Sequence, residues 1–154
     1  METWEQQLTE ILEKEETLLQ AILDEARLKT VALKSADIKS LGDIVNIEQP
    51  LAMRLEAAER KRRDIMDDAG LGGLSLSELT CRVNGDYSDK LEKRLKSMSQ
   101  ILLGLKRINA LNIELTRSRL EFYDYLRGAG RQGYENDGRV RQPHRSRAVI
   151  DRKA

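Results

Sequence analysis

The sequence predicts an all-α fold: an elongated antiparallel bundle of three long helices plus one short helix, followed by a flexible C-terminal tail. Charged residues make up 34% of the 154 residues and aromatic residues only 4%, a composition typical of long amphipathic helices. Only 2 prolines interrupt the chain, and the apolar residues of three long segments recur at steps of three and four, as a helix requires. A chain of this length most simply forms one compact unit.

The first long helix is expected from about Thr3 to Leu33. Its apolar side chains form two adjacent stripes, and together they are wider than the seam of a dimeric coiled coil. A face of this width packs against two neighbours, so the segment favours a bundle over a lone zipper. The stripes consist of Leu8, Ile11, Leu18 and Ile22 and of Leu12, Leu19, Leu23 and Ala26.

A second helix is expected from Ile38 to Met66, with Ser35 or Asp37 as its N-cap. Pro50 falls inside this segment. Because proline removes a helical hydrogen bond and clashes with the carbonyl four residues earlier, we expect a kink or a short break near Asn46 to Pro50.

A short helix is expected from Leu76 to Arg82, after a glycine-rich turn at 70–73. Ser75 and Glu78 form the S-x-x-E capping box that marks its start. The chain's single cysteine, Cys81, lies in this amphipathic helix, where we expect a buried, inert thiol.

The longest helix is expected from about Asp89 to Arg127, after which repeated glycines interrupt any regular pattern. The expected organisation is therefore a helical bundle domain over 1–127 and a flexible basic tail over 128–154. Residues 127–154 carry eight Arg or Lys against three acids, a net charge of +5, whereas residues 1–25 carry a net charge of −7. The total of +1 thus conceals two oppositely charged ends.

Motifs for catalysis are missing from the sequence: it has no phosphate-binding glycine loop, no dinucleotide fingerprint after a strand and no nucleophile elbow. Cys81 and the single histidine, His144, cannot form the His/Cys clusters of zinc or iron sites. We therefore expect no enzyme, no cofactor and no metal.

The acidic N-terminus lacks the basic leader of a secretory signal, and no apolar run approaches the roughly 20 residues of a membrane span. A cytoplasmic protein without membrane insertion is expected.

Four of the six aromatic residues fall within residues 122–134. Such a concentration of large amphipathic side chains indicates either the end of the core or a contact surface, and the sequence leaves both interpretations open. Trp4 is expected to cap the core, with a partner anchor as the alternative. Asn109 and Asn112 interrupt the apolar stripe of the longest helix, where an asparagine either selects register or partner within the seam or simply points to solvent.

The end of the longest helix carries a series of spaced motifs. They read Leu102-x-x-Leu105-x-x-Ile108-Asn109-x-Leu111-Asn112-x-x-Leu115, then Leu120-x-Phe122-x-x-Tyr125-Leu126, then Tyr134-Glu135-Asn136-Asp137-Gly138. Upstream, Leu55-Glu56-x-x-x-Arg60, the glycine turn and Leu76-x-x-Leu79 follow in order. This series resembles the FlgN-type flagellar export chaperones, in layout over about residues 3–140 and in motif over about 102–138.

The resemblance implies a small, cytoplasmic, nearly all-helical protein that is not an enzyme and that holds hook-filament junction proteins before flagellar type III export. The implied clients are the hook-associated proteins FlgK and FlgL, which it keeps from premature association. The export gate or ATPase complex is left open as a further partner. The implied partner-binding residues are Leu111, Asn112, Leu115, Arg119, Phe122, Tyr125 and Leu126.

Two alternatives stay open at this point. The basic stretch 139–153 is compatible with a helical nucleic-acid-associated protein, whose binding would fall steeply with salt. The absence of aromatic residues after Tyr134 argues against it, because single-stranded nucleic acid is usually bound by stacking. A structural coiled-coil scaffold is the other alternative, and it predicts a stable elongated oligomer without a client.

Overall fold

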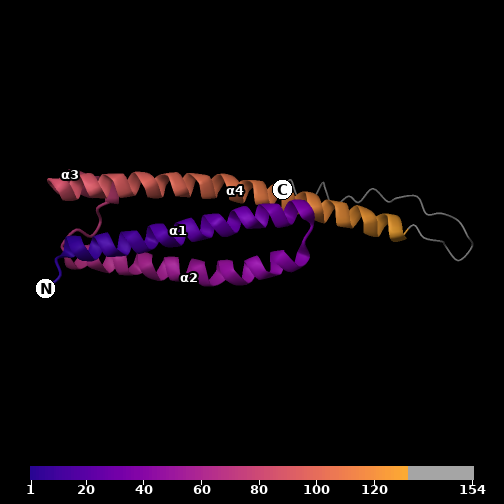
Figure 1. Ribbon diagram of the computed structural model, residues 1–154, viewed down its shortest axis with the longest axis horizontal. Coiled ribbons are helices and arrows are strands. Elements are labelled where there is room, and N and C mark those ends of the chain that lie inside the picture. Colours follow the sequence, from indigo (N-terminus) through magenta and orange to yellow (C-terminus); the bar gives the residue numbers. More distant parts are fainter. Residues whose placement is uncertain (132–154) are drawn as a thin grey trace, which may run out of the picture. The chain divides into compact units, whose positions relative to one another are not determined.

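The computed structural model describes residues 1–131 (Figure 1), and the rest of the predicted tail lies outside them. The described residues form four helices and no strand: α1 (Trp4–Ser35), α2 (Ile38–Asp68), α3 (Leu76–Arg82) and α4 (Asp86–Arg131). The predicted all-α bundle of three long helices and one short helix is confirmed. By their internal contacts, residues 1–113 form a first unit, and a second unit begins at Glu114 within α4.

The helices begin where polar side chains accept hydrogen bonds from free N–H groups of the first turn. At the start of α1, Thr3 and Gln6 form a reciprocal capping box. At the start of α3, Ser75 and Glu78 form the one that the sequence predicts. Asp37 caps α2 with its side chain. The local sequence signals therefore decide where three of the helices begin.

α1 and α2 pack side by side and run antiparallel (Figure 1). Near the start of α1, Glu15 forms an ion pair with Arg62, with 2.8 Å between Oε1 and Nε. Further along α1, Lys29 pairs with Glu48, with 3.0 Å between Nζ and Oε2. Glu15, near the start of α1, thus pairs near the end of α2, whereas Lys29, near the end of α1, pairs closer to the start of α2. This order is that of antiparallel helices.

α1 also packs against α4, and these two helices run parallel. Glu16 accepts hydrogen bonds from Arg94 at 2.8 Å and from Ser97 at 2.7 Å, near the start of α4. Further along both helices, the Thr30 hydroxyl donates a hydrogen bond to Asn112 Oδ1 at 2.6 Å. Consecutive long helices are antiparallel, as expected, and this up-down-up order makes the first and the last of them parallel.

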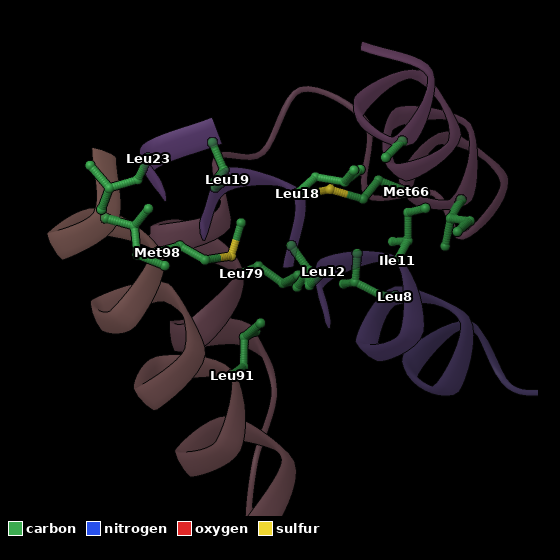
Figure 2. Packing of buried hydrophobic residues seen from close by; sticks show 13 residues of the cluster. Leu8, Ile11, Leu12, Leu18, Leu19, Leu23, Met66, Leu79, Leu91 and Met98 are labelled. Atoms are coloured by element: carbon green, nitrogen blue, oxygen red, sulfur yellow. The ribbon is translucent and has the colours of Figure 1, made fainter. Parts of the chain in front are cut away.

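The core of the first unit draws side chains from all four helices. Figure 2 shows Leu12 of α1, Met66 of α2, Leu79 of α3, and Leu91 and Met98 of α4 in one cluster. Leu12 and Leu79 are completely buried. Because burial of one leucine side chain stabilises a fold by about 1.5–3 kcal/mol, Leu79 is the main apolar anchor that holds the seven-residue α3 in place.

The break expected near Pro50 does not occur, because α2 is continuous from Ile38 to Asp68. Pro50 and Asn46 are both exposed. Water can therefore bind the Asn46 carbonyl, which lacks its usual helical N–H donor at a proline. The helix loses one hydrogen bond and continues.

Two further expectations need correction. Cys81 is exposed rather than buried, because it lies two residues, or about 200°, around α3 from the buried Leu79. The longest helix begins at Asp86 and continues to Arg131, past the residue at which we expect it to end. The domain boundary at residue 128 stays a prediction.

Candidate partner-binding surface

The second unit exposes apolar side chains on α4. Five residues of one short stretch are each at least 40% exposed: Leu120, Phe122, Tyr123, Tyr125 and Leu126. The rings of Phe122 and Tyr123 contact each other, with centroids 6.4 Å apart and planes tilted by 54°. Large contiguous apolar patches are rare on monomeric proteins and usually mark a site of interaction. These exposures favour a contact surface over a core for Phe122, Tyr123 and Tyr125, whereas Tyr134, the fourth aromatic residue of the cluster, lies outside the described residues.

Four of the predicted partner-binding residues share one side of this part of α4. Leu115, Arg119, Phe122 and Leu126 follow one another at steps of four, three and four, which keeps them within about 60° of the helix circumference. Leu115 and Arg119 are half-buried, and Phe122 and Leu126 are exposed. Tyr125 flanks this α4 stripe and is exposed as well.

Leu111 and Asn112 belong to the first unit and differ from each other. Leu111 is exposed, whereas Asn112 is buried. The Asn112 Nδ2 donates to the Ala26 carbonyl at 2.9 Å, and its Oδ1 accepts from Thr30 at 2.6 Å. The structure thus gives Asn112 an internal role as a polar link between α1 and α4, and this burial argues against direct contact with a partner. Asn109 is exposed, so only one of the two asparagines occupies the seam.

Trp4 packs half-buried against the core at the start of α1, as expected of a capping residue. Its ring meets that of Tyr87 edge-on, with centroids 6.1 Å apart and planes at 85°. Burial raises the pKa of the Tyr87 hydroxyl above its ordinary value. This aromatic pair joins the first turns of α1 and α4.

Sequence reasoning missed a buried charge in the bundle. Glu15 is buried, and its partner Arg62 is partly accessible. Burial raises the pKa of Glu15, although the hydrogen bond and the positive charge of Arg62 oppose that change. A signal exists in the sequence, because Glu15 lies four residues after Ile11 and three before Leu18, within the apolar face.

Other features of the described part of the chain are less distinctive. A surface pocket of about 440 Å³ lies between α1 and α2, where acidic and basic side chains surround Ile11 and Ile65. Residues 1–131 contain no group of three or more His, Cys, Asp or Glu that could hold a metal ion. Within the same range, no helix combines the length and apolarity that crossing a membrane requires.

Apolar side chains are also exposed on the first unit. The helical pattern assigns Ile38 and Val45 of α2 and Leu102 of α4 to apolar faces, yet all three are exposed, as is Ile113 of α4. The pattern correctly identifies the apolar positions, but it cannot show which of them lack a neighbour in the folded chain.

Uncovered apolar helix faces on a bundle are typical of proteins that present a surface to another protein. The sequence matches the FlgN protein family over residues 1–140, which is most of its length. The chain therefore belongs to the FlgN family, a family of flagellar export chaperones, and the resemblance is confirmed.

A curated relative of the chain is YvyG of Bacillus subtilis (strain 168), itself described as an uncharacterized protein. The two sequences are 33% identical over 106 residues, which cover 64% of this chain and 65% of the relative. The chain thus spans slightly less than two thirds of that relative's length. No solved structure matches the chain.

Proposed function

We propose that this chain is a cytoplasmic export chaperone that binds the hook-filament junction proteins FlgK and FlgL and keeps them from premature association. Membership of the FlgN family supports the role in export. The observation that carries the choice of surface is the exposure of Phe122, Tyr125 and Leu126 on one side of α4. Contact with the export gate or ATPase complex stays a prediction.

The proposed mechanism is the covering of helix faces. Amphipathic helices at the end of a junction subunit would associate with one another or aggregate if they were left free, and an apolar helical surface on a chaperone can cover them. Aromatic side chains suit this task because they bury a large area while losing little rotamer freedom. The complex must dissociate before export, and buried area alone does not determine how tightly it holds.

Six residues are the proposed contacts on the chaperone. Phe122 and Tyr125 serve as the aromatic anchors, and the leucines enlarge the apolar area around them. Arg119, at the edge of the α4 stripe, supplies positive charge that helps orient an incoming helix. The six are Leu111, Leu115, Arg119, Phe122, Tyr125 and Leu126; Asn112 is left out because its amide serves the bundle.

The direct test removes both anchors from the full chain. A variant with Phe122→Ala and Tyr125→Ala should bind FlgK and FlgL at least about tenfold more weakly in isothermal titration calorimetry, since buried aromatic anchors dominate protein interfaces. Its circular dichroism should be unchanged, because both side chains are exposed and alanine favours helix.

The matched control is Leu120→Ala on the same helix. Leu120 is exposed like Phe122 but lies about 200° around α4 from it, outside the α4 stripe. The control should keep the affinity of the unmodified chain. Unchanged affinity of the double variant, or an equal loss in the control, would count against the proposed surface.

A further inference from the structure

α1 and α4 together form a face that points away from α2. On α1, Glu15 pairs with α2 and Glu16 pairs with α4, and these consecutive residues are about 100° apart around the helix. Three exposed residues of α1 lie on the side opposite α2, about 160–180° from Glu15. They are Glu13, Asp24 and Val31. This side of α1 is therefore open to a partner.

The same face continues onto α4. Asn112 marks the side of α4 that meets α1, because its amide donates to the Ala26 carbonyl at 2.9 Å. Lys93, Arg107 and Leu111 are exposed, and they lie about 100–140° around α4 from Asn112. The displacement from the shared contact has opposite senses on the two parallel helices. Both sets of residues therefore lie on one face, which we call the α1–α4 face.

Opposite charges lie side by side on the α1–α4 face. α1 supplies the carboxylates of Glu13 and Asp24, whereas α4 has no acidic residue within 93–113. No ion pair between the described residues involves Glu13 or either basic residue of the face. Asp24 meets Arg27 at 3.5 Å, but both side chains are exposed and such a pair contributes little. The acidic half of the face thus complements the basic half of an identical face.

Contacts within the chain show which residues of the two helices lie at equal heights along the bundle. Glu16 meets Arg94 and Ser97, which follow it by 78 and 81 positions in the sequence. Thr30 meets Asn112, which follows it by 82 positions. A residue of α1 therefore lies level with the residue of α4 that follows it by about 80 positions.

We propose that the α1–α4 face binds the same face of a second copy of this chain, with the two copies parallel and related by a two-fold axis along the bundle. Such an axis places α1 of each copy against α4 of the other at equal height, so every contact occurs twice. Two contacts join opposite charges, and a third packs apolar side chains at one end of the interface. The facing pairs are Glu13 with Lys93, Asp24 with Arg107, and Val31 with Leu111.

Charge and area both support this arrangement. An antiparallel pair of copies would place α1 on α1 and α4 on α4, with carboxylates facing carboxylates and basic side chains facing one another. A nucleic acid or an anionic membrane would meet the carboxylates of α1 beside the basic side chains of α4. From residue 13 to residue 31, α1 extends about 27 Å, and two adjacent helices are about 20 Å wide. The two copies would then bury about 1,100 Å² in total, near the lower limit for a specific interface, so the dimer should be weak and depend on concentration.

The test reverses charges on one helix at a time in the full chain and measures self-association by sedimentation equilibrium up to about 0.5 mM. Glu13→Lys with Asp24→Lys makes both halves of the face basic, and Lys93→Glu with Arg107→Glu makes both halves acidic. The unmodified chain should dimerise, and each double variant alone should dimerise at least about tenfold more weakly. An equimolar mixture of the two variants should regain the affinity of the unmodified chain, because both contacts of a mixed dimer again join opposite charges.

The matched control is Asp64→Lys with Asp68→Lys, which makes the same change of net charge at two exposed positions of α2. The control should dimerise like the unmodified chain, and circular dichroism should show that all the variants keep their helices. No client enters the experiment, and Leu111, which this interface shares with the proposed client contacts, stays unchanged, so the result is independent of the proposed function.

Three results would overturn the inference. The first is an unmodified chain that stays monomeric over the whole concentration range. The second is a mixture of the two double variants that associates no better than its components. The third is a variant with Lys93→Glu and Arg107→Glu that dimerises as strongly as the unmodified chain, because the carboxylates of α1 would then bind some other basic part of the chain, such as residues 139–153.

Discussion

At the scale of single residues, the polar link at Asn112 explains how a largely apolar bundle fixes one register. Leucines alone pack almost as well after a shift along the helix, whereas a buried amide needs its own partners. Asn112 finds them in Thr30 and in the Ala26 carbonyl. The parallel pair α1 and α4 thereby acquires a preferred alignment.

Replacement of Asn112 by alanine should therefore destabilise the fold. We expect the free energy of unfolding to fall by about 1–3 kcal/mol, because the change creates a cavity and removes both hydrogen bonds. Urea denaturation measures this loss as a lower midpoint. Asn109→Ala, at an exposed position on the same helix, should stay within about 0.5 kcal/mol. Equal effects at the two positions would argue against a register role for Asn112.

The buried Glu15 makes a prediction about pH. Since its pKa in the folded chain lies above its ordinary value of 4.5, the folded state binds the proton more tightly than the unfolded state does. Its contribution to stability is then fully present below that ordinary value and is lost as the pH rises through the raised pKa. Glu15→Gln, which cannot ionise, should gain stability relative to the unmodified chain between pH 4 and pH 7.

Urea unfolding at a series of pH values tests this expectation. Glu13→Gln, on the exposed face of the same helix, is the control for the loss of one negative charge. A stability difference for Glu15→Gln that does not change with pH, or that shifts in favour of the unmodified chain as the pH rises, would contradict the argument.

At the scale of elements, local signals decide most of the secondary structure. Helical periodicity predicts the three long helices, and the capping box of Ser75 and Glu78 predicts the start of the short one. The box of Thr3 and Gln6 fixes the start of α1 in the same way. The rule for proline fails at Pro50, because the sequence does not show that this position faces water and that the surrounding helix is held by its neighbours. As a result, α2 lacks one backbone hydrogen bond, which a residue other than proline at position 50 could form.

Pro50→Ala should consequently stabilise the chain. Alanine restores the N–H donor and the helical preference, and we expect the free energy of unfolding to rise by up to about 3 kcal/mol. Gly42→Ala in the same helix provides a comparison, since a methyl group there meets no atom within 4 Å and should add about 1 kcal/mol. A lower urea midpoint for Pro50→Ala would show that the proline shapes α2 in a way that the bundle needs.

Contacts between distant residues could not be predicted from the sequence. The register that joins Asn112 to Thr30, and the pairing of Glu15 with Arg62, depend on how whole helices meet. The exposure of Cys81 depends on which side of α3 turns inward. The sequence predicts the apolar end of α4 as a candidate surface, but the exposure of Ile38, Val45 and Leu102 emerges only in the fold.

At the scale of the whole molecule, the exposed apolar side chains distinguish the chaperone account from the nucleic-acid alternative. The chaperone role that we propose requires uncovered apolar side chains, and the chain leaves several of them exposed on α4 instead of using every apolar residue for its own core. The nucleic-acid alternative predicts binding to duplex DNA at low salt that weakens steeply as salt is added. Our account predicts no such binding.

The most direct test of the chaperone account is hydrogen–deuterium exchange of the full chain with and without FlgK or FlgL. The account predicts slower amide exchange along α4 from residue 114 to residue 129 when a junction protein is bound, with the buried stretch of α1 around Leu12 unchanged. A junction protein that leaves exchange in this part of α4 unchanged, or that slows exchange only elsewhere, would contradict it.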